Sequence, residues 1–193
     1  MDHVTNRSYE QMKSILKAVT NLFHKSKSST SISPCLTASS GDVIQQFREE
    51  ALEAHNVRRT KHLVPPLVLN DDLNEYAQNW AEHLVKSNTF QHSNCMLRSD
   101  RLGENVANKW SSEGADLSGE EVTEMWYSEI SNYSFSGSNS QNTGHFTQVV
   151  WKSTREMGIG KAKGNDGKVI VVANYRPPGN LMGSFNENVF PTE

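Results

Sequence analysis

The chain has 193 residues, of which 35% are hydrophobic and 21% are charged, and its formal net charge is −3. This length and composition predict a soluble globular protein with one domain and a substantial core. Residues 1–40 carry five basic and two acidic side chains, a net +3, which leaves −6 on the rest of the chain. A mildly acidic body without a basic stripe is repelled by phosphate backbones, which argues against a nucleic-acid-binding protein.

The N-terminal extension, residues 1–41, contains a predicted basic amphipathic helix over residues 9–25, followed by a Ser-rich linker over residues 26–41. Lysines on its other faces would attract an anionic membrane, each contributing on the order of 1 kcal/mol. The alternatives are a helix packed on its own domain or on a partner protein, or a disordered leader, because a lone helix of this length is marginal in water. The apolar residues at helical spacing are Met12, Ile15, Leu16, Val19, Leu22 and Phe23.

The expected domain, residues 42–193, opens with helices that begin at Asp42, Asp72 and Ser118. Each start shows an N-cap residue followed three positions later by Gln or Glu. The first helix is expected to end near Arg59 and the second near Asn88. The apolar residues that predict buried faces are Val43, Phe47, Ala51 and Ala54 in the first helix, Leu73, Tyr76, Ala77, Trp80, Ala81, Leu84 and Val85 in the second, and Val122, Met125 and Trp126 in the third.

Three strands are expected towards the C-terminus, at about residues 146–152, 157–163 and 168–175. The last two are joined through Gly164-Asn165-Asp166-Gly167, a strong turn signal. Val169 to Val172 is continuously apolar, as in a strand that is covered on both faces. The periodicity therefore predicts a sheet sandwiched between helices.

Glu129 lies one helical turn beyond Met125 and Trp126, so its carboxylate is expected on the buried face of that helix. Burying a carboxylate without a partner costs roughly several kcal/mol of folding free energy. A buried Glu129 is therefore expected to be protonated or to lie next to a cation, a histidine or a metal.

Two segments of the chain stand out, the run Gly144 to Trp151 and the run Val171 to Asn180. They resemble the signature motifs of the CAP superfamily, which includes cysteine-rich secretory proteins, insect venom antigen 5 and plant pathogenesis-related class 1 proteins. The resemblance extends from about Asp42 to Pro191. It implies an α+β fold, a three-layer alpha-beta-alpha sandwich with a mainly antiparallel central sheet, in agreement with the periodicity.

The resemblance also implies a site in a central cleft, made of His92, Glu104, Glu129 and His145. Two neutral imidazoles suit a divalent transition metal such as zinc, with carboxylates or water completing a weak, open shell. One alternative is purely structural, with each histidine hydrogen-bonded to a glutamate. Another is a metal-dependent hydrolase or protease with a glutamate as base, although the helical His-Glu-x-x-His spacing is absent.

Other residues with reactive side chains have weaker signals. Cys95 lies three residues after His92 and is expected to be a bystander thiol, and no Gly-x-Ser-x-Gly elbow supports a serine nucleophile. His55, Asn56 and Arg59 match a recurrent family pattern, for which packing and hydrogen bonding are favoured over function. The remaining histidines are expected at the surface: His3, His24, His62 and His83.

The cysteines and the N-terminus favour an intracellular protein. Only Cys35 and Cys95 are present, so a disulfide framework is not expected, and Ala173 stands where secreted members of the family carry a cysteine. No apolar run near Met1 forms a signal peptide, and Asp2 replaces the glycine that myristoylation requires. We expect a cytoplasmic protein, peripheral on a membrane such as the Golgi, although non-classical secretion stays open.

The function expected from the family and the N-terminal helix is binding rather than turnover, with lipids or an anionic membrane surface as the ligands. The competing hypotheses are the metal-dependent hydrolase and a protein-interaction module that forms homodimers.

Overall fold

The computed structural model describes residues 40–136 and 142–193. The chain divides into two units, residues 1–37 and 38–193, and every described helix and strand belongs to the second. The helix predicted over residues 9–25 lies outside the described residues, and so does most of the predicted linker. Ser40 and Gly41, which end that linker in the prediction, already belong to a helix.

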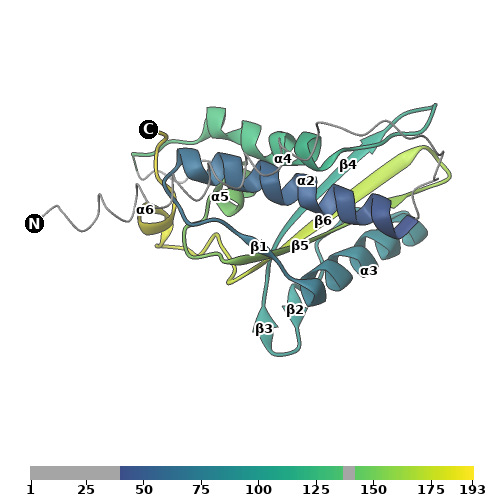
Figure 1. Cartoon of the computed structure of the whole chain (residues 1–193), viewed down its shortest axis with the longest axis horizontal. Helices are drawn as coiled ribbons and strands as arrows, with labels where there is room; N and C mark the ends of the chain where they lie inside the picture. Colours follow the sequence, from purple (N-terminus) through teal and green to yellow (C-terminus); the bar gives the residue numbers. More distant parts are fainter. Residues whose placement is uncertain (1–39, 137–141) are drawn as a thin grey trace, which may run out of the picture. The chain divides into compact units, whose positions relative to one another are not determined.

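The centre of the fold is a mainly antiparallel sheet, which confirms the expected α+β class (Figure 1). Within this sheet the neighbours β5, β6 and β4 are antiparallel, and the short β1 is parallel to β5. A separate antiparallel ribbon is formed by β2 and β3. In sheet order the strands are β1 (Val68–Leu69), β5 (Glu156–Lys163), β6 (Lys168–Arg176) and β4 (Gly103–Trp110), and the ribbon strands are β2 (Met96–Leu97) and β3 (Asp100–Arg101).

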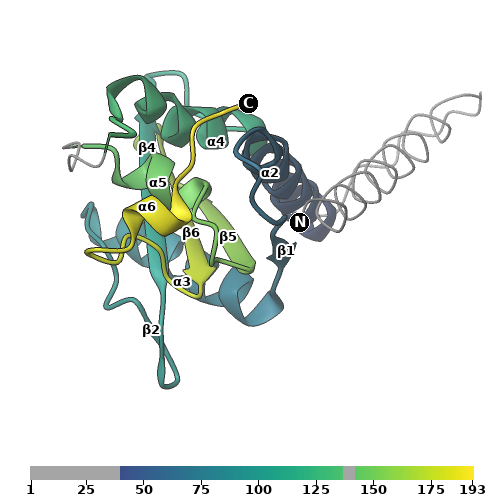
Figure 2. The same cartoon turned by 90° about the vertical axis from the view of Figure 1, so that its left-hand side faces the viewer.

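Helices cover both faces of the sheet and complete the three expected layers (Figures 1 and 2). One face packs against α3 (Asp71–Ser87), which contacts β5 and β6. The other layer contains α2, α4 and α5, of which α2 packs on α4 and β5, and α5 contacts β4. The remaining bounds are α2 (Ser40–Lys61), α4 (Gly119–Tyr127), the 3-10 helix η1 (Ser128–Asn132), α5 (Gly144–Val149) and α6 (Phe185–Asn188).

Two glycines of β5 let α3 lie directly on the sheet. A Cβ atom on Gly160 would come within 2.3 Å of the Gln78 Cα atom, and one on Gly158 within 2.1 Å of the Leu73 carbonyl carbon. The short β1 pairs with only the first two residues of β5, and side chains of α3 bond to main-chain groups of β5 farther along the strand. Asn74 accepts from the Ile159 amide, and Gln78 bonds to both the amide and the carbonyl of Lys161. The edge of β5 is therefore covered rather than left open.

The core lies on both sides of β6, as its continuous apolar run predicts. Val169 to Ala173 are fully buried. Their side chains alternate between two clusters, one under α3 and a larger one beneath α2, α4 and α5.

The helices predicted from periodicity are present, with corrections at their starts and faces. The second starts from Asn70 rather than Asp72, and the Asn70 side chain accepts from the Leu73 amide. The predicted capping box of the third, Ser118 with Glu121, is confirmed.

Two residues expected on buried helix faces are exposed. Val43 is 54% exposed because α2 meets α4 one turn later, around Phe47. Met125 is 43% exposed because the buried stripe of α4 runs along Val122, Thr123, Trp126 and Tyr127 instead.

The strand predicted over residues 146–152 is wrong, since this segment begins within α5 and its residues after Val149 form no strand. Its apolar run is buried on all sides, and so short a run does not separate a strand from a helix by periodicity. The predictions for β5 and β6 are confirmed, whereas β1 and β4 were not predicted. None of the helices in the described ranges is long and apolar enough to span a lipid bilayer.

Candidate functional site

The first candidate pair joins the loop after α3 to the start of β4. His92 lies just beyond Asn88, the left-handed residue that ends α3, and Glu104 is the second residue of β4. The His92 Nδ1 atom is 2.8 Å from Glu104 Oε1. The Glu104 side chain is 1% exposed, whereas that of His92 is 61% exposed. The carboxylate is therefore fixed inside the protein and presents the imidazole to solvent.

Three further hydrogen bonds hold the Glu104 carboxylate. The Ser93 amide donates to Oε1 at 2.8 Å, and the Ser93 hydroxyl and the Asn174 amide donate to Oε2 at 2.6 Å and 3.1 Å. Burial by itself raises the pKa of Glu104, but the hydrogen bonds from His92, Ser93 and Asn174 outweigh it and hold the pKa below its ordinary value. The hydrogen bond to Glu104 raises the pKa of His92, against a smaller opposing effect of burial. Glu104 is thus an anion that supports an imidazole.

The second pair has the same pattern on the opposite layer. Glu129 lies in η1, and its Oε1 atom is 2.7 Å from the Nδ1 atom of His145, the second residue of α5. Its other oxygen accepts from the main-chain amides of His145 and Phe146 at 3.0 Å and 3.2 Å. Glu129 therefore caps the first turn of α5 and orients the His145 ring at the same time. Its carboxylate is 22% exposed, so the expected burial is partial, and its partner is the histidine.

Asn105 connects the two pairs. It follows Glu104 on β4, it is 1% exposed, and its amide donates to the main-chain oxygen of His145 at 3.2 Å. The same amide reaches the Tyr175 hydroxyl at 3.3 Å. On the other side of His145, the Trp126 ring lies nearly parallel to the imidazole, with centroids 6.4 Å apart. The backbone of His145 is thus tied to the strand that carries Glu104.

This arrangement brings the four predicted residues together as two histidine–glutamate pairs. In both pairs Nδ1 faces the carboxylate, and Nε2 makes no hydrogen bond to any residue of the described ranges. Across residues 40–136 and 142–193, no group of three or more His, Cys, Asp or Glu side chains is placed to hold a metal ion. Each pair taken by itself has the arrangement in which an outer carboxylate orients a metal-binding histidine.

The arrangement also bears on the hydrolase hypothesis. Each oxygen of Glu104 accepts two hydrogen bonds, and both oxygens of Glu129 accept from α5. A general base needs a lone pair within reach of the proton that it removes. Both oxygens of Glu104 are therefore occupied, whereas Oε1 of Glu129 accepts a single hydrogen bond, from His145.

Neither Arg59 nor any of the other histidines in residues 40–136 and 142–193 bonds to these pairs. The His55 ring and the Arg59 guanidinium are fully buried and bond to groups of the protein, as expected from packing. The surface location predicted for His62 is wrong. His62 is fully buried, with Nε2 2.9 Å from the Tyr127 hydroxyl and Nδ1 bonded to the Phe190 main-chain oxygen. Tertiary contacts of this kind leave no periodic signal in the sequence.

Sequence reasoning did not assign roles to the residues that support the pairs, Ser93, Asn105 and Asn174. Each is a direct neighbour of a predicted residue or lies within a quoted motif, so adjacency was the available signal. Cys95 bonds locally to Ser93, and burial raises the pKa of its thiol, in keeping with a bystander.

Similarity to known proteins agrees with this fold. The chain is 47% identical over 150 residues to the human Golgi-associated plant pathogenesis-related protein 1. The aligned region covers 76% of this chain and 94% of the human protein. It is 36% identical over 142 residues to pathogenesis-related protein 1C of Nicotiana tabacum. The aligned region covers 72% of this chain and 80% of the tobacco protein.

A crystal structure of NaASP2 with Zn2+ superimposes with a TM-score of 0.60 at 25% identity, covering 81% of this chain and 90% of that one. The model of the CAP family, the cysteine-rich secretory protein family, matches residues 52–175. That span contains most of the fold, from within α2 to within β6, and both histidine–glutamate pairs, and the chain belongs to the CAP family.

Proposed function

We propose that this protein binds a divalent transition metal, zinc first, through the Nε2 atoms of His92 and His145. The observation that carries the proposal is the shared orientation of the two rings, each with Nδ1 held by a carboxylate and Nε2 without a hydrogen-bond partner among the described residues. The zinc-containing relative supports the choice of ion. Glu104 and Glu129 then act as orienting partners rather than ligands, which refines the predicted set of four ligands.

Two protein ligands make a weak and accessible site, because structural zinc sites use four protein ligands and catalytic sites three. When bound, zinc supplies a Lewis acid and polarises a coordinated water or ligand oxygen. The protein supplies two imidazoles, each oriented by the hydrogen bond between its Nδ1 atom and a carboxylate.

Calorimetric zinc titration of the metal-stripped full chain tests this proposal. We expect binding that the His92→Ala, His145→Ala double change abolishes, and that Glu104→Gln weakens about 10–100-fold because it removes a charged orienting partner. His83→Ala is the matched control, since His83 is exposed, stacks on Trp80 and bonds to neither pair. Zinc affinity that survives the double change would place the ion elsewhere.

Zinc affinity should also depend on pH. A histidine must be neutral to coordinate, so protons compete with the metal. Glu104 raises the pKa of His92. As the pH is lowered, zinc affinity should therefore start to decrease before the pH reaches about 6.5, the ordinary histidine pKa, and it should keep decreasing in more acidic solution. The same titration between pH 8 and pH 5.5 measures this, and an affinity independent of pH would contradict histidine ligands.

We also propose peripheral membrane attachment through residues 9–25, which the sequence predicts to form a basic amphipathic helix. The Golgi association printed in the name of the human relative supports a membrane location. In co-sedimentation with phosphatidylserine vesicles, Lys13→Gln with Lys17→Gln should weaken binding by roughly 30-fold, since each lysine near the surface contributes about 1 kcal/mol. Lys86→Gln with Lys109→Gln is the control, because both lysines are exposed on the domain. An equal loss of vesicle binding in the two double variants would show that the predicted helix is not the membrane anchor.

A further inference from the structure

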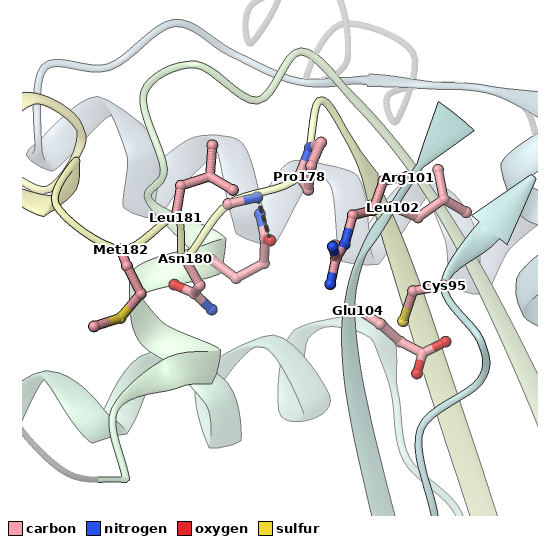
Figure 3. A pocket seen from close by; sticks show the side chains of 11 residues that line it. Cys95, Arg101, Leu102, Glu104, Pro178, Asn180, Leu181 and Met182 are labelled. Atoms are coloured by element: carbon pink, nitrogen blue, oxygen red, sulfur yellow. Dashed lines mark hydrogen bonds between the residues drawn. The ribbon is translucent and has the colours of Figure 1, made fainter. Parts of the chain in front are cut away.

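Successive side chains of β4 project to opposite faces of the central sheet. Figure 3 shows the Glu104 carboxylate beside Cys95, which directly precedes the β2–β3 ribbon. Asn105 therefore projects into the layer of α2, α4 and α5, where it is buried. The main-chain oxygen of His145 fixes the orientation of the Asn105 amide, because a carbonyl can only accept a hydrogen bond. The amide nitrogen thus gives one N–H group to His145 and has a second for Tyr175.

The donor and acceptor atoms of His55 are fixed by the same reasoning. Its Nδ1 atom is 2.7 Å from the main-chain oxygen of Ala51, one turn earlier in α2, so Nδ1 carries the proton. Burial lowers the pKa of His55 to about 4, so the ring is neutral near neutral pH. In a neutral imidazole with its proton on Nδ1, the Nε2 atom can only accept.

Tyr175 is the donor to that nitrogen. Its hydroxyl oxygen is 2.9 Å from His55 Nε2, and it has a single proton to give. Burial raises the pKa of Tyr175, so the hydroxyl keeps this proton. Its oxygen then accepts the second N–H group of Asn105, at 3.3 Å. A chain of hydrogen bonds therefore runs from Asn105 through Tyr175 to His55, and each bond has one possible direction.

The His55 ring is also confined by α4. The Thr123 hydroxyl donates to the Gly119 carbonyl at 2.7 Å, and its oxygen lies 3.2 Å from His55 Nδ1. The Trp126 ring packs edge-on against His55 and nearly parallel to His145, with centroid distances of 6.2 Å and 6.4 Å. The imidazole of His55 therefore has no room to rotate towards another partner.

We propose that His55 is a positioning residue for His145. It acts through Tyr175 and Asn105 on the main chain of His145, whereas Glu129 orients the ring. Together these contacts direct the His145 Nε2 atom. The inference rests on the proposed function, because the direction of this atom matters for binding only if it is a metal ligand.

Proton–nitrogen correlation spectra of the metal-free full chain test the hydrogen-bond chain without zinc. We expect His55 as the Nδ1-protonated tautomer with a hydrogen-bonded Nε2. Tyr175→Phe removes the hydroxyl proton, so the Nε2 resonance should move to that of a free pyridine-type nitrogen. The amide resonance of Phe146 should move as well, because its N–H belongs to the same peptide group as the His145 carbonyl.

Tyr127→Phe is the matched control. The Tyr127 hydroxyl is also 2.9 Å from the Nε2 atom of a buried histidine, His62, but among the described residues neither member of this pair bonds to His145. Removal of this hydroxyl should leave the His55 Nε2 resonance and the zinc affinity unchanged.

Zinc titration then measures what the chain of hydrogen bonds contributes to binding. Tyr175→Phe and His55→Leu should each weaken zinc binding about tenfold, the lower end of the effect of partners that support a ligand. His55→Gln should bind zinc as the wild type does, because a glutamine oxygen can accept from the Tyr175 hydroxyl. Thermal unfolding of each variant shows whether it is folded at the temperature of the titration.

The outcomes separate this inference from the proposed function. A wild-type protein that binds no zinc overturns the metal site, and the spectra still decide whether His55 holds His145. The opposite tautomer of His55, or a Phe146 amide resonance that Tyr175→Phe does not move, would overturn the positioning role. So would an unchanged zinc affinity in a folded Tyr175→Phe variant, or an equal loss of affinity in Tyr127→Phe.

Discussion

At the scale of single residues, Arg59 is a fully buried cation whose hydrogen bonds go to main-chain carbonyl groups. Its guanidinium donates to the carbonyls of Pro65, Val149, Trp151 and Thr154 at 2.7–3.1 Å. It thereby fastens α2 to the loop after α2 and to the segment that contains α5. Arg59→Met would leave these four acceptors without their donor inside the protein.

We expect Arg59→Met to lower the free energy of unfolding by about 3–5 kcal/mol, since each buried carbonyl that is left without a donor costs about 1–3 kcal/mol. Urea unfolding followed by tryptophan fluorescence measures it. Arg98→Met is the control, since the Arg98 side chain is 77% exposed and its ion pair with Asp72 contributes about 0.5 kcal/mol or less. A loss below about 1 kcal/mol in Arg59→Met would show that water replaces the guanidinium.

At the scale of elements, the contact between α3 and β5 depends on the absence of side chains on the strand. At Gly160 a Cβ atom would meet the Gln78 Cα and N atoms at 2.3 Å and 2.4 Å, which are backbone atoms that cannot rotate away. Gly160→Ala should therefore push α3 off the sheet and destabilise the protein by about 1–3 kcal/mol. Thermal unfolding measures the change.

Gly144→Ala provides the comparison for Gly160→Ala. The nearest atom to a Cβ on Gly144 is the Asn180 Nδ2 atom at 3.7 Å, an ordinary contact, so stability should change by about 0.5 kcal/mol or less. An equally small effect at Gly160 would mean that α3 and β5 have room to separate.

The elements differ in how far the sequence alone predicts them. Local signals were enough for α4, where Ser118 and Glu121 form the capping box, and for β5 and β6, whose turn lies at Gly164 to Gly167. The start of α5 is capped by Glu129, which lies 16 residues earlier in the chain than His145, so no local pattern could reveal it. In β4 the last three residues are exposed, and the polar residues Glu104 and Asn105 lie near its start. The strand therefore lacks the alternation of apolar and polar residues that predicts a strand.

The candidate site was predictable in its members and not in its arrangement. The family motifs name His92, Glu104, Glu129 and His145, because those positions can be read along the chain. Which ring nitrogen faces a carboxylate depends on how η1, α5 and β4 pack together, and that is a property of the tertiary structure. Our proposal that the two imidazoles would hold a metal, with the two carboxylates as their supports, rests on that packing.

At the scale of the whole molecule, buried neutral histidines connect stability to pH. His55 lies on α2, is fully buried and contacts α4 and β6. Its Nδ1 atom is near the Ala51 carbonyl, and its Nε2 atom is 2.9 Å from the Tyr175 hydroxyl. Burial lowers the pKa of His55 to about 4, opposed in part by the bond to Ala51 and assisted by the charges of Arg59 and Arg58. Burial also lowers the pKa of His62.

The folded protein therefore resists protonation at His55 while the unfolded chain accepts the proton near pH 6.5. The stabilisation is fully present above about pH 6.5 and is lost as the pH falls towards 4, at up to about 1.4 kcal/mol per pH unit and about 3 kcal/mol in total. Urea unfolding between pH 7.5 and pH 4.5 should show this slope, and His55→Gln should flatten it even if the variant is less stable throughout. His83→Gln, at an exposed position, should keep the wild-type slope. A slope that persists in His55→Gln would assign the acid sensitivity to His62 or to the carboxylates with lowered pKa, among them Glu104 and Glu156, whose protonation acts in the same direction at lower pH.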